Sequence, residues 1–154
     1  MADYFFDSSG LTKRYINETG SIWVENIIVP ASGNSVFVAN ITGVEVVSAI
    51  ARRVRGGKLS AVAALSAISS LERDLSAEYL LTDISYALVT SAMSLANKHA
   101  LRGYDAVQLA VAVDVNQNNL AFGLTPIIFV SADNNLNNAA QTEGLAVENP
   151  NNYP

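Results

Sequence analysis

The stretch Asp3–Tyr15, DYFFDSSGLTKRY, contains the change of pattern that decides the fold. Its first four residues form a short apolar run that predicts a strand over residues 3–6, ending at Asp7. The turn and N-cap residues Ser8, Ser9 and Gly10 follow, and they predict a helix through Tyr15. A strand that passes directly into a helix is the unit of parallel sheets covered by helices, so this stretch predicts an α/β fold.

The rest of the chain repeats this alternation. Hydrophobic periodicity and turn residues predict further strands over residues 36–39, 79–81, 127–130 and 145–147. They predict further helices over residues 21–28, 45–54, 60–75, 84–99, 105–115 and 133–143, and the helix over 60–75 has one apolar stripe, Val62, Leu65, Ile68, Leu71 and Leu75. Short strands between longer helices predict a three-layer α/β/α domain with a short central parallel sheet, formed as one domain by residues 1–154. The polar tail, residues 148–154, is expected to lie over the surface or to fray.

The composition leaves carboxylates as the main source of chemistry. A chain of 154 residues that is 50% hydrophobic can form one compact domain with its own core. It has no cysteine and one histidine, His99, which excludes a disulfide framework, a thiolate zinc site, a cysteine nucleophile and a multi-histidine metal site. The start MADYFFDSSG has no signal-peptide pattern and no apolar run is long enough to span a bilayer, so we expect a cytoplasmic protein without a membrane segment.

Four acids fall at the points where strands or loops pass into helices. Asp7 and Asp133 follow predicted strands, Glu45 begins the helix after the strand over 36–39, and Asp105 begins the helix after Arg102 and Gly103. The carboxyl ends of parallel strands meet at one edge of a sheet, so we expect Asp7 and Asp133 to lie near each other.

Each acid also has a purely structural interpretation. Asp7 and Asp133 are typical N-caps, and Glu45 has the spacing of a capping box with Thr42. Asp105, at a helix N-terminus, would interact favourably with the helix dipole. Several carboxylates brought together would repel one another unless cations balanced them, and an all-oxygen ligand set favours Mg²⁺ or Mn²⁺.

The net charge bears on the partner. Nine basic and fourteen acidic residues give −5, which argues against a polyanionic partner, but the remaining surface would be nearly neutral if the four acids held cations. The one local basic cluster is Arg52, Arg53, Arg55 and Lys58, at the end of the helix that Glu45 opens. Arg52 and Arg53 are candidate RNA-binding residues, although a solvated helix C-terminus explains the cluster slightly better.

Four blocks are spaced along essentially the whole chain: DYFFDSSGLTKRY, ITGVEVVSAIARR, HALRGYDAVQLA and FVSADNNLNNAAQTEGLAVENP. They resemble the signature blocks of PIN-domain proteins, specifically the VapC-type toxin ribonucleases, and the block around Asp105 is the most specific. The stretch Asn134–Asn138 differs from the family, which often carries Lys or Arg there, so substrate affinity or specificity is expected to differ.

The resemblance implies a metal site and an activity. It implies that the metal-binding and catalytic acids are Asp7, Glu45, Asp105 and Asp133. It implies that Ser9 and Ser131 orient carboxylates or waters, while turn and capping roles for both stay open. The implied activity is a Mg²⁺-dependent (or Mn²⁺-dependent) endoribonuclease that hydrolyses RNA, the toxin of a toxin–antitoxin pair, with a VapB-like antitoxin and a homodimeric state.

Two other functions are compatible with the same residues. One is a non-catalytic PIN-like dimer that binds a protein or nucleic acid, and the other is a structure-specific DNA nuclease, because the metal chemistry does not distinguish the sugars. Metal-dependent cleavage of RNA, of DNA or of neither separates the three hypotheses. A site with one metal ion and a site with two are both compatible with these acids.

Overall fold

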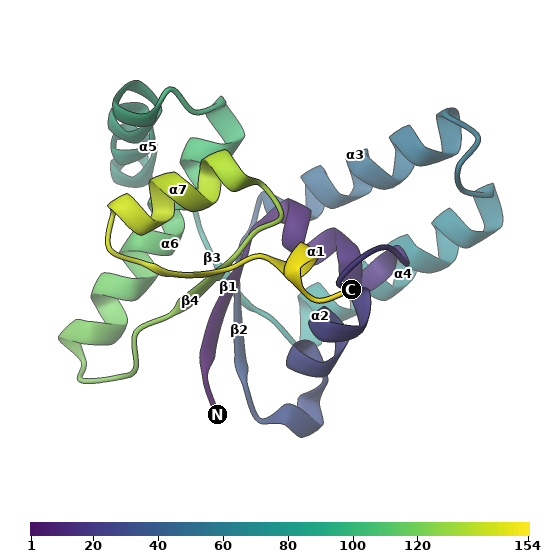
Figure 1. Ribbon diagram of the computed structural model, residues 1–154, viewed down its shortest axis with the longest axis horizontal. Coiled ribbons are helices and arrows are strands. Elements are labelled where there is room, and N and C mark those ends of the chain that lie inside the picture. Colours follow the sequence, from purple (N-terminus) through teal and green to yellow (C-terminus); the bar gives the residue numbers. More distant parts are fainter.

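A computed structural model describes residues 1–154, and five parallel strands cross its middle (Figure 1). The strands are β1 (Asp3–Phe6), β2 (Ser35–Ala39), β3 (Leu80–Thr82), β4 (Ile128–Val130) and β5 (Ala146–Glu148). Their order in the sheet is β3-β2-β1-β4-β5, so β1 lies at the centre and the chain changes direction of travel beside it. In such sheets the carboxyl ends on either side of this switch form a natural crevice for a site.

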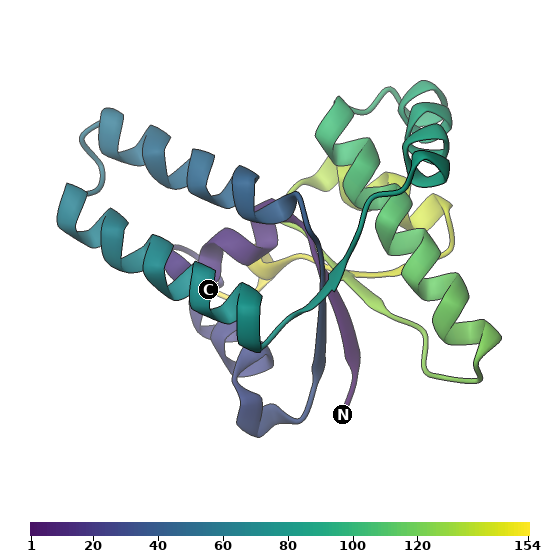
Figure 2. The same ribbon diagram turned by 180° about the vertical axis from the view of Figure 1, so that it is seen from behind.

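Helices cover both faces of the sheet, as predicted. One face carries α1 (Ser8–Tyr15), α2 (Ser21–Ile28), α3 (Thr42–Arg55) and α4 (Ala61–Ala77). The other carries α5 (Tyr86–His99), α6 (Gly103–Ala121) and α7 (Asn134–Thr142), and Figure 2 shows the two groups on opposite sides of the strands. This arrangement confirms the three-layer α/β/α fold with a short parallel sheet.

Alternation along β1 separates two hydrophobic cores. Phe5 lies opposite Phe129 of β4 on the side of α6 and α7, with ring centroids 5.9 Å apart. Phe6 packs with Val130 on the side of α1 to α4. Since neighbouring residues of a strand point to opposite faces, four residues suffice to anchor both layers.

The element boundaries differ from the prediction mainly at α6. The predicted helix stops at Val115, where the apolar pattern ends, but α6 continues to Ala121. Two asparagines hold this extension against neighbouring segments. The Asn119 side-chain amide donates to Asp3 and to the Thr125 carbonyl, and the Asn116 side chain accepts from the Ile127 amide. Polar residues that bond inward therefore extend a helix that hydrophobicity alone would end. The edge strands β3 and β5 each lie one residue later than predicted.

The apolar stripe predicted for α4 packs only along part of its length. Leu71 is fully buried, whereas Val62 and Leu65 are 79% and 68% exposed. The α3–α4 hairpin projects away from the sheet in both views, so the first turns of α4 lie where the core does not reach (Figures 1 and 2).

The tail, residues 148–154, lies over the surface, where packing and hydrogen bonds hold it. The Tyr153 ring stacks on Trp23 with centroids 4.5 Å apart, and its hydroxyl donates to Glu148 over 2.8 Å. Pro150 is buried against Gly20, whose φ of +86° and lack of a Cβ allow this close approach. No helix combines the length and the apolar character needed to cross a membrane.

Candidate metal centre

Asp7 is the buried acid at the carboxyl end of β1. It caps α1 by accepting from the Gly10 amide over 2.7 Å, so the structural N-cap interpretation holds for this residue. Gly10 is required there, because a Cβ would come within 2.7 Å of the Val130 carbonyl oxygen and separate α1 from β4. The Asp7 side chain is therefore pinned at the junction of β1, α1 and β4.

Two serine hydroxyls also contact the Asp7 carboxylate. Ser9 Oγ lies 2.8 and 2.9 Å from the two carboxylate oxygens, and Ser131 Oγ donates to Oδ2 over 2.9 Å. Ser9 also accepts from the Ala132 amide, which joins the end of β1 to the end of β4. The structure thus places both predicted serines against an acid of the site.

The pKa of Asp7 is raised from 3.8 to about 7, mainly because burial removes water from the charged form. The bonds from Gly10, Ser9 and Ser131 oppose this effect, and the charge of Glu45 adds to it. Neutral donors alone do not balance the Asp7 charge. A cation would do so.

Asp133 follows β4 and caps α7. Its Oδ1 accepts from the amides of Asn135 and Leu136 over 2.8 and 3.1 Å, so this acid also fulfils its structural interpretation. The Ser131 hydroxyl accepts from the Asp133 amide, which ties this acid to the same serine that contacts Asp7.

Glu45 does not form the predicted capping box with Thr42. The α3 helix has Ile41 at its N-cap, and Thr42 lies inside the helix, fully buried, where its hydroxyl contacts Gln108 instead. The Glu45 carboxylate accepts from Ser8 Oγ through Oε2 (3.1 Å) and from Gln108 Nε2 through Oε1 (2.7 Å). It therefore points toward the end of β1 rather than back along its own helix.

Asp105 occupies the first turn of α6 and is half-buried. Burial raises the pKa of its carboxyl, the charges of Asp133 and Glu45 raise it further, and Arg102 lowers it. The four predicted acids are therefore electrostatically coupled: Asp7 to Glu45, and Asp105 to both Asp133 and Glu45.

These acids surround one edge of the sheet without closing on one point. No three His, Cys, Asp or Glu side chains of the chain lie close enough together to hold a metal ion as they stand. The donor set nevertheless fits a hard divalent cation, because all four groups offer carboxylate oxygens. None of the four forms an ion pair with a basic side chain.

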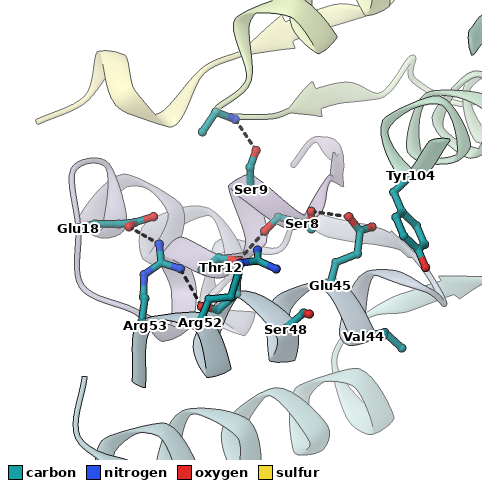
Figure 3. Close-up of a pocket in the computed structure, with 12 residues that line it drawn as sticks. Ser8, Ser9, Thr12, Glu18, Val44, Glu45, Ser48, Arg52, Arg53 and Tyr104 are labelled. Carbon is teal, nitrogen blue, oxygen red and sulfur yellow. Dashed lines mark hydrogen bonds and ion pairs between the residues drawn. The ribbon is translucent and has the colours of Figure 1, made fainter. Parts of the chain in front are cut away.

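A pocket of about 400 Å³ opens between α1 and α3, and Glu45 is the one candidate acid that lines it (Figure 3). Ser8 and Ser9 of α1 line one side of it, Glu45, Arg52 and Arg53 of α3 line the other, and the half-exposed Tyr104 stands at its end. The two arginines differ.

Arg53 donates to Glu18 over 2.8 Å and to the Ala49 carbonyl over 3.3 Å, so it ties α3 to the segment after α1. Arg52 forms no ion pair with any acid of the chain. Of the predicted pair, the structure therefore leaves only the Arg52 charge uncompensated.

Three side chains that hold the site were not singled out from the sequence: Ser8, Thr42 as a partner of Gln108, and Gln108 itself. A signal for Gln108 existed, since it lies three residues after Asp105 and therefore on the same side of α6. Its hydrogen bond to Glu45 joins two residues that are 63 positions apart in sequence, and no local sequence pattern predicts such a contact.

Comparisons with known proteins identify the fold. No protein-family model and no curated protein sequence matches the chain. Among solved structures, it is similar to VapBC2 from Rickettsia felis bound to a promoter DNA fragment (TM-score 0.64, 14% identity, covering 96% of this chain and 98% of that one). It is also similar to VapC20 from Mycobacterium tuberculosis, described as a sarcin–ricin loop cleaving toxin (TM-score 0.63, 17% identity, covering 93% of this chain and 96% of that one). A third similar structure is PAE2754 from Pyrobaculum aerophilum (TM-score 0.62, 17% identity, covering 95% of this chain and 89% of that one).

These likenesses extend over nearly the full length of each protein at low sequence identity. The chain therefore has the PIN-domain fold of the VapC-type proteins.

Proposed function

We propose that this protein is a Mg²⁺-dependent endoribonuclease that hydrolyses RNA phosphodiester bonds, and that it acts as the toxin of a toxin–antitoxin pair. The observation that carries the proposal is a set of four carboxylates at one sheet edge, of which Asp7, Glu45 and Asp133 accept only from neutral donors and none pairs with a basic side chain. The fold it shares with VapC20, a toxin that cleaves the sarcin–ricin loop, supports RNA as the substrate.

The residues that would hold Mg²⁺ (or Mn²⁺) are Asp7, Glu45, Asp105 and Asp133. A bound ion of this kind lowers the pKa of a coordinated water and neutralises charge that develops on a phosphate. Ser9 and Ser131 keep the Asp7 carboxylate in one orientation, and the Asp133 cap fixes one of its oxygens while the other accepts no bond from the chain.

The pocket supplies the contact to substrate. Arg52 carries a positive charge that no acid of the chain neutralises, and it lies on the same helix and the same side of the pocket as Glu45, which supports a role in binding a phosphate next to the cleaved one. Arg53 forms an ion pair with Glu18, so its role is to stabilise the fold. This division refines the expectation that both arginines bind RNA.

The test is cleavage of a panel of structured RNAs and of single- and double-stranded DNA, with Mg²⁺, Mn²⁺ or EDTA. The wild type is compared with Asp105→Asn and with Asp114→Asn, a matched control farther along the same helix. We expect RNA cleavage that needs metal and Asp105 but not Asp114. Cleavage of DNA alone would support a DNA nuclease, and no cleavage by a folded protein that binds RNA would support a non-catalytic module.

The partners implied by this function are an antitoxin and a second copy of the chain. VapBC2 is by its name a complex of two proteins, which supports a VapB-like antitoxin for this chain. An antitoxin arginine would find unpaired carboxylates at the site, since a guanidinium binds a carboxylate through two parallel hydrogen bonds. Light scattering on the purified protein tests the homodimer: a mass of about twice 16.3 kDa is expected, and a monomeric mass contradicts it.

A further inference from the structure

Gln108 joins the two layers of helices beside the site. It lies on α6 and is 1% exposed, while its partners Thr42 and Glu45 lie on α3, on the opposite face of the sheet. Its Nε2 donates to Glu45 Oε1 over 2.7 Å and to Thr42 Oγ1 over 2.8 Å. One amide therefore uses both of its hydrogens on α3.

Glu45 fixes which way this amide points, because a carboxylate only accepts hydrogen bonds and therefore needs the Nε2 group rather than Oε1. The Thr42 hydroxyl is fully buried and can donate to Gln108 Oε1 over 3.2 Å as well as accept from Nε2. A buried amide that turned away would leave donors unpaired, which is costly in a site shielded from water. The Thr42 contact thus holds the amide against α3, and the Glu45 carboxylate selects its Nε2 group.

The bond leaves Glu45 able to bind a cation. Ser8 contacts one carboxylate oxygen and Gln108 contacts the other, so each oxygen keeps acceptor capacity. Both donors are neutral, so neither cancels the negative charge as a lysine or arginine would. The side chain is held in place and remains an anion.

We infer that Gln108 is a positioning residue, which holds the Glu45 carboxylate at the metal centre from the opposite layer of helices and so sets the affinity for the divalent ion. The inference rests on the proposed nuclease function. Groups that orient metal ligands through hydrogen bonds typically contribute about 10- to 100-fold to metal affinity or activity.

The variant Gln108→Met tests this, because Met has nearly the same length and volume but donates no hydrogen bond. Gln117→Met is the control, since Gln117 lies on the same helix but is exposed. Calorimetric titration with Mn²⁺ should show a Kd about 10- to 100-fold weaker for Gln108→Met and an unchanged Kd for Gln117→Met. RNA cleavage should decrease in parallel, while circular dichroism shows the same helix content.

A double-mutant cycle separates positioning from a merely structural role. If Gln108 acts through Glu45, then Gln108→Met should weaken Mn²⁺ binding no further in a Glu45→Ala background. An equal loss in both backgrounds would contradict the inference. Should Gln108→Met fail to fold, Thr42→Val releases the same amide with little change of shape, and it should weaken Mn²⁺ binding in the same direction.

The remaining outcomes distinguish the two levels of the proposal. Wild-type protein that binds Mn²⁺ and cleaves RNA, beside a Gln108→Met variant with the same Kd and rate, overturns the positioning role alone. Wild-type protein that binds no Mn²⁺ overturns the proposed function and this inference with it.

Discussion

Replacing Asp7 by Asn should make the protein more stable and inactive. The Asp7 carboxyl is fully buried, and its pKa rises from 3.8 to about 7, so the folded state binds this proton more tightly than the unfolded chain does. A raised carboxyl pKa contributes stability below pH 4, and this stability is lost as the pH rises to about 7. The difference corresponds to about 4 kcal/mol at pH 8.

Asn removes the charge and keeps the shape. Its carbonyl can accept from the Gly10 amide as Asp7 Oδ1 does, and its NH₂ can donate to the hydroxyls of Ser9 and Ser131. We therefore expect Asp7→Asn to gain up to about 4 kcal/mol at pH 8 in EDTA, which for a chain of this size is a rise of about 8–16 °C in Tm.

The assay is thermal unfolding followed by circular dichroism at pH 4, 6 and 8 in EDTA, with and without added Mg²⁺. Wild-type stability should decrease as the pH rises through this window, whereas Asp7→Asn should change much less. Mg²⁺ should stabilise the wild type at pH 8 and leave Asp7→Asn unaffected, because only the wild type offers the charged ligand. A variant that is less stable than wild type at pH 8 in EDTA would refute the reasoning.

Three further substitutions test other parts of the structure. Arg52→Glu should raise KM for RNA at least tenfold without changing Tm, whereas Arg55→Glu, beyond the pocket, should change KM far less; equal effects would exclude a specific phosphate contact. Arg53→Ala should lower the free energy of unfolding by about 1 kcal/mol in urea, since it breaks a half-buried pair with Glu18, and an unchanged value would contradict this. Phe129→Ala should cost about 3–5 kcal/mol in the same assay, because it empties the centre of one core, and a cost under 1 kcal/mol would contradict that placement.

The fold was predictable because its strands are short and distinct. DYFF and IIFV are apolar runs bounded by turn residues, and both pair at the centre of the sheet as their composition predicts. The predictions that were wrong concern polar residues that face inward. Asn116 and Asn119 extend α6 past its apolar stretch by bonding to neighbouring segments, and Thr42, which was expected to form a capping box, makes a buried contact with α6 instead.

Parallel topology brings strand ends together and so predicted that Asp7 and Asp133 lie near each other, whereas the resemblance to PIN-domain proteins assigned Glu45 and Asp105 to the same site. Asp7 does lie beside the residues that follow β4, as the hydrogen bonds of Ser9 and Ser131 between the two segments show. Sequence patterns could not show that Asp7 is buried while Asp105 is half-exposed, since burial depends on packing between distant helices. Nor could composition distinguish Arg52 from Arg53, whose difference lies in a pairing with Glu18 across 35 residues.

A crystal structure of the protein grown with Mn²⁺ tests the central claim most directly, because the anomalous signal locates the ion without reference to activity. We expect a Mn²⁺ peak at the carboxyl ends of β1 and β4, with ligands drawn from Asp7, Glu45, Asp105 and Asp133, and we expect this peak to be lost in Asp105→Asn. Saturating Mn²⁺ with no peak at this edge, or a peak held by other residues, would contradict it.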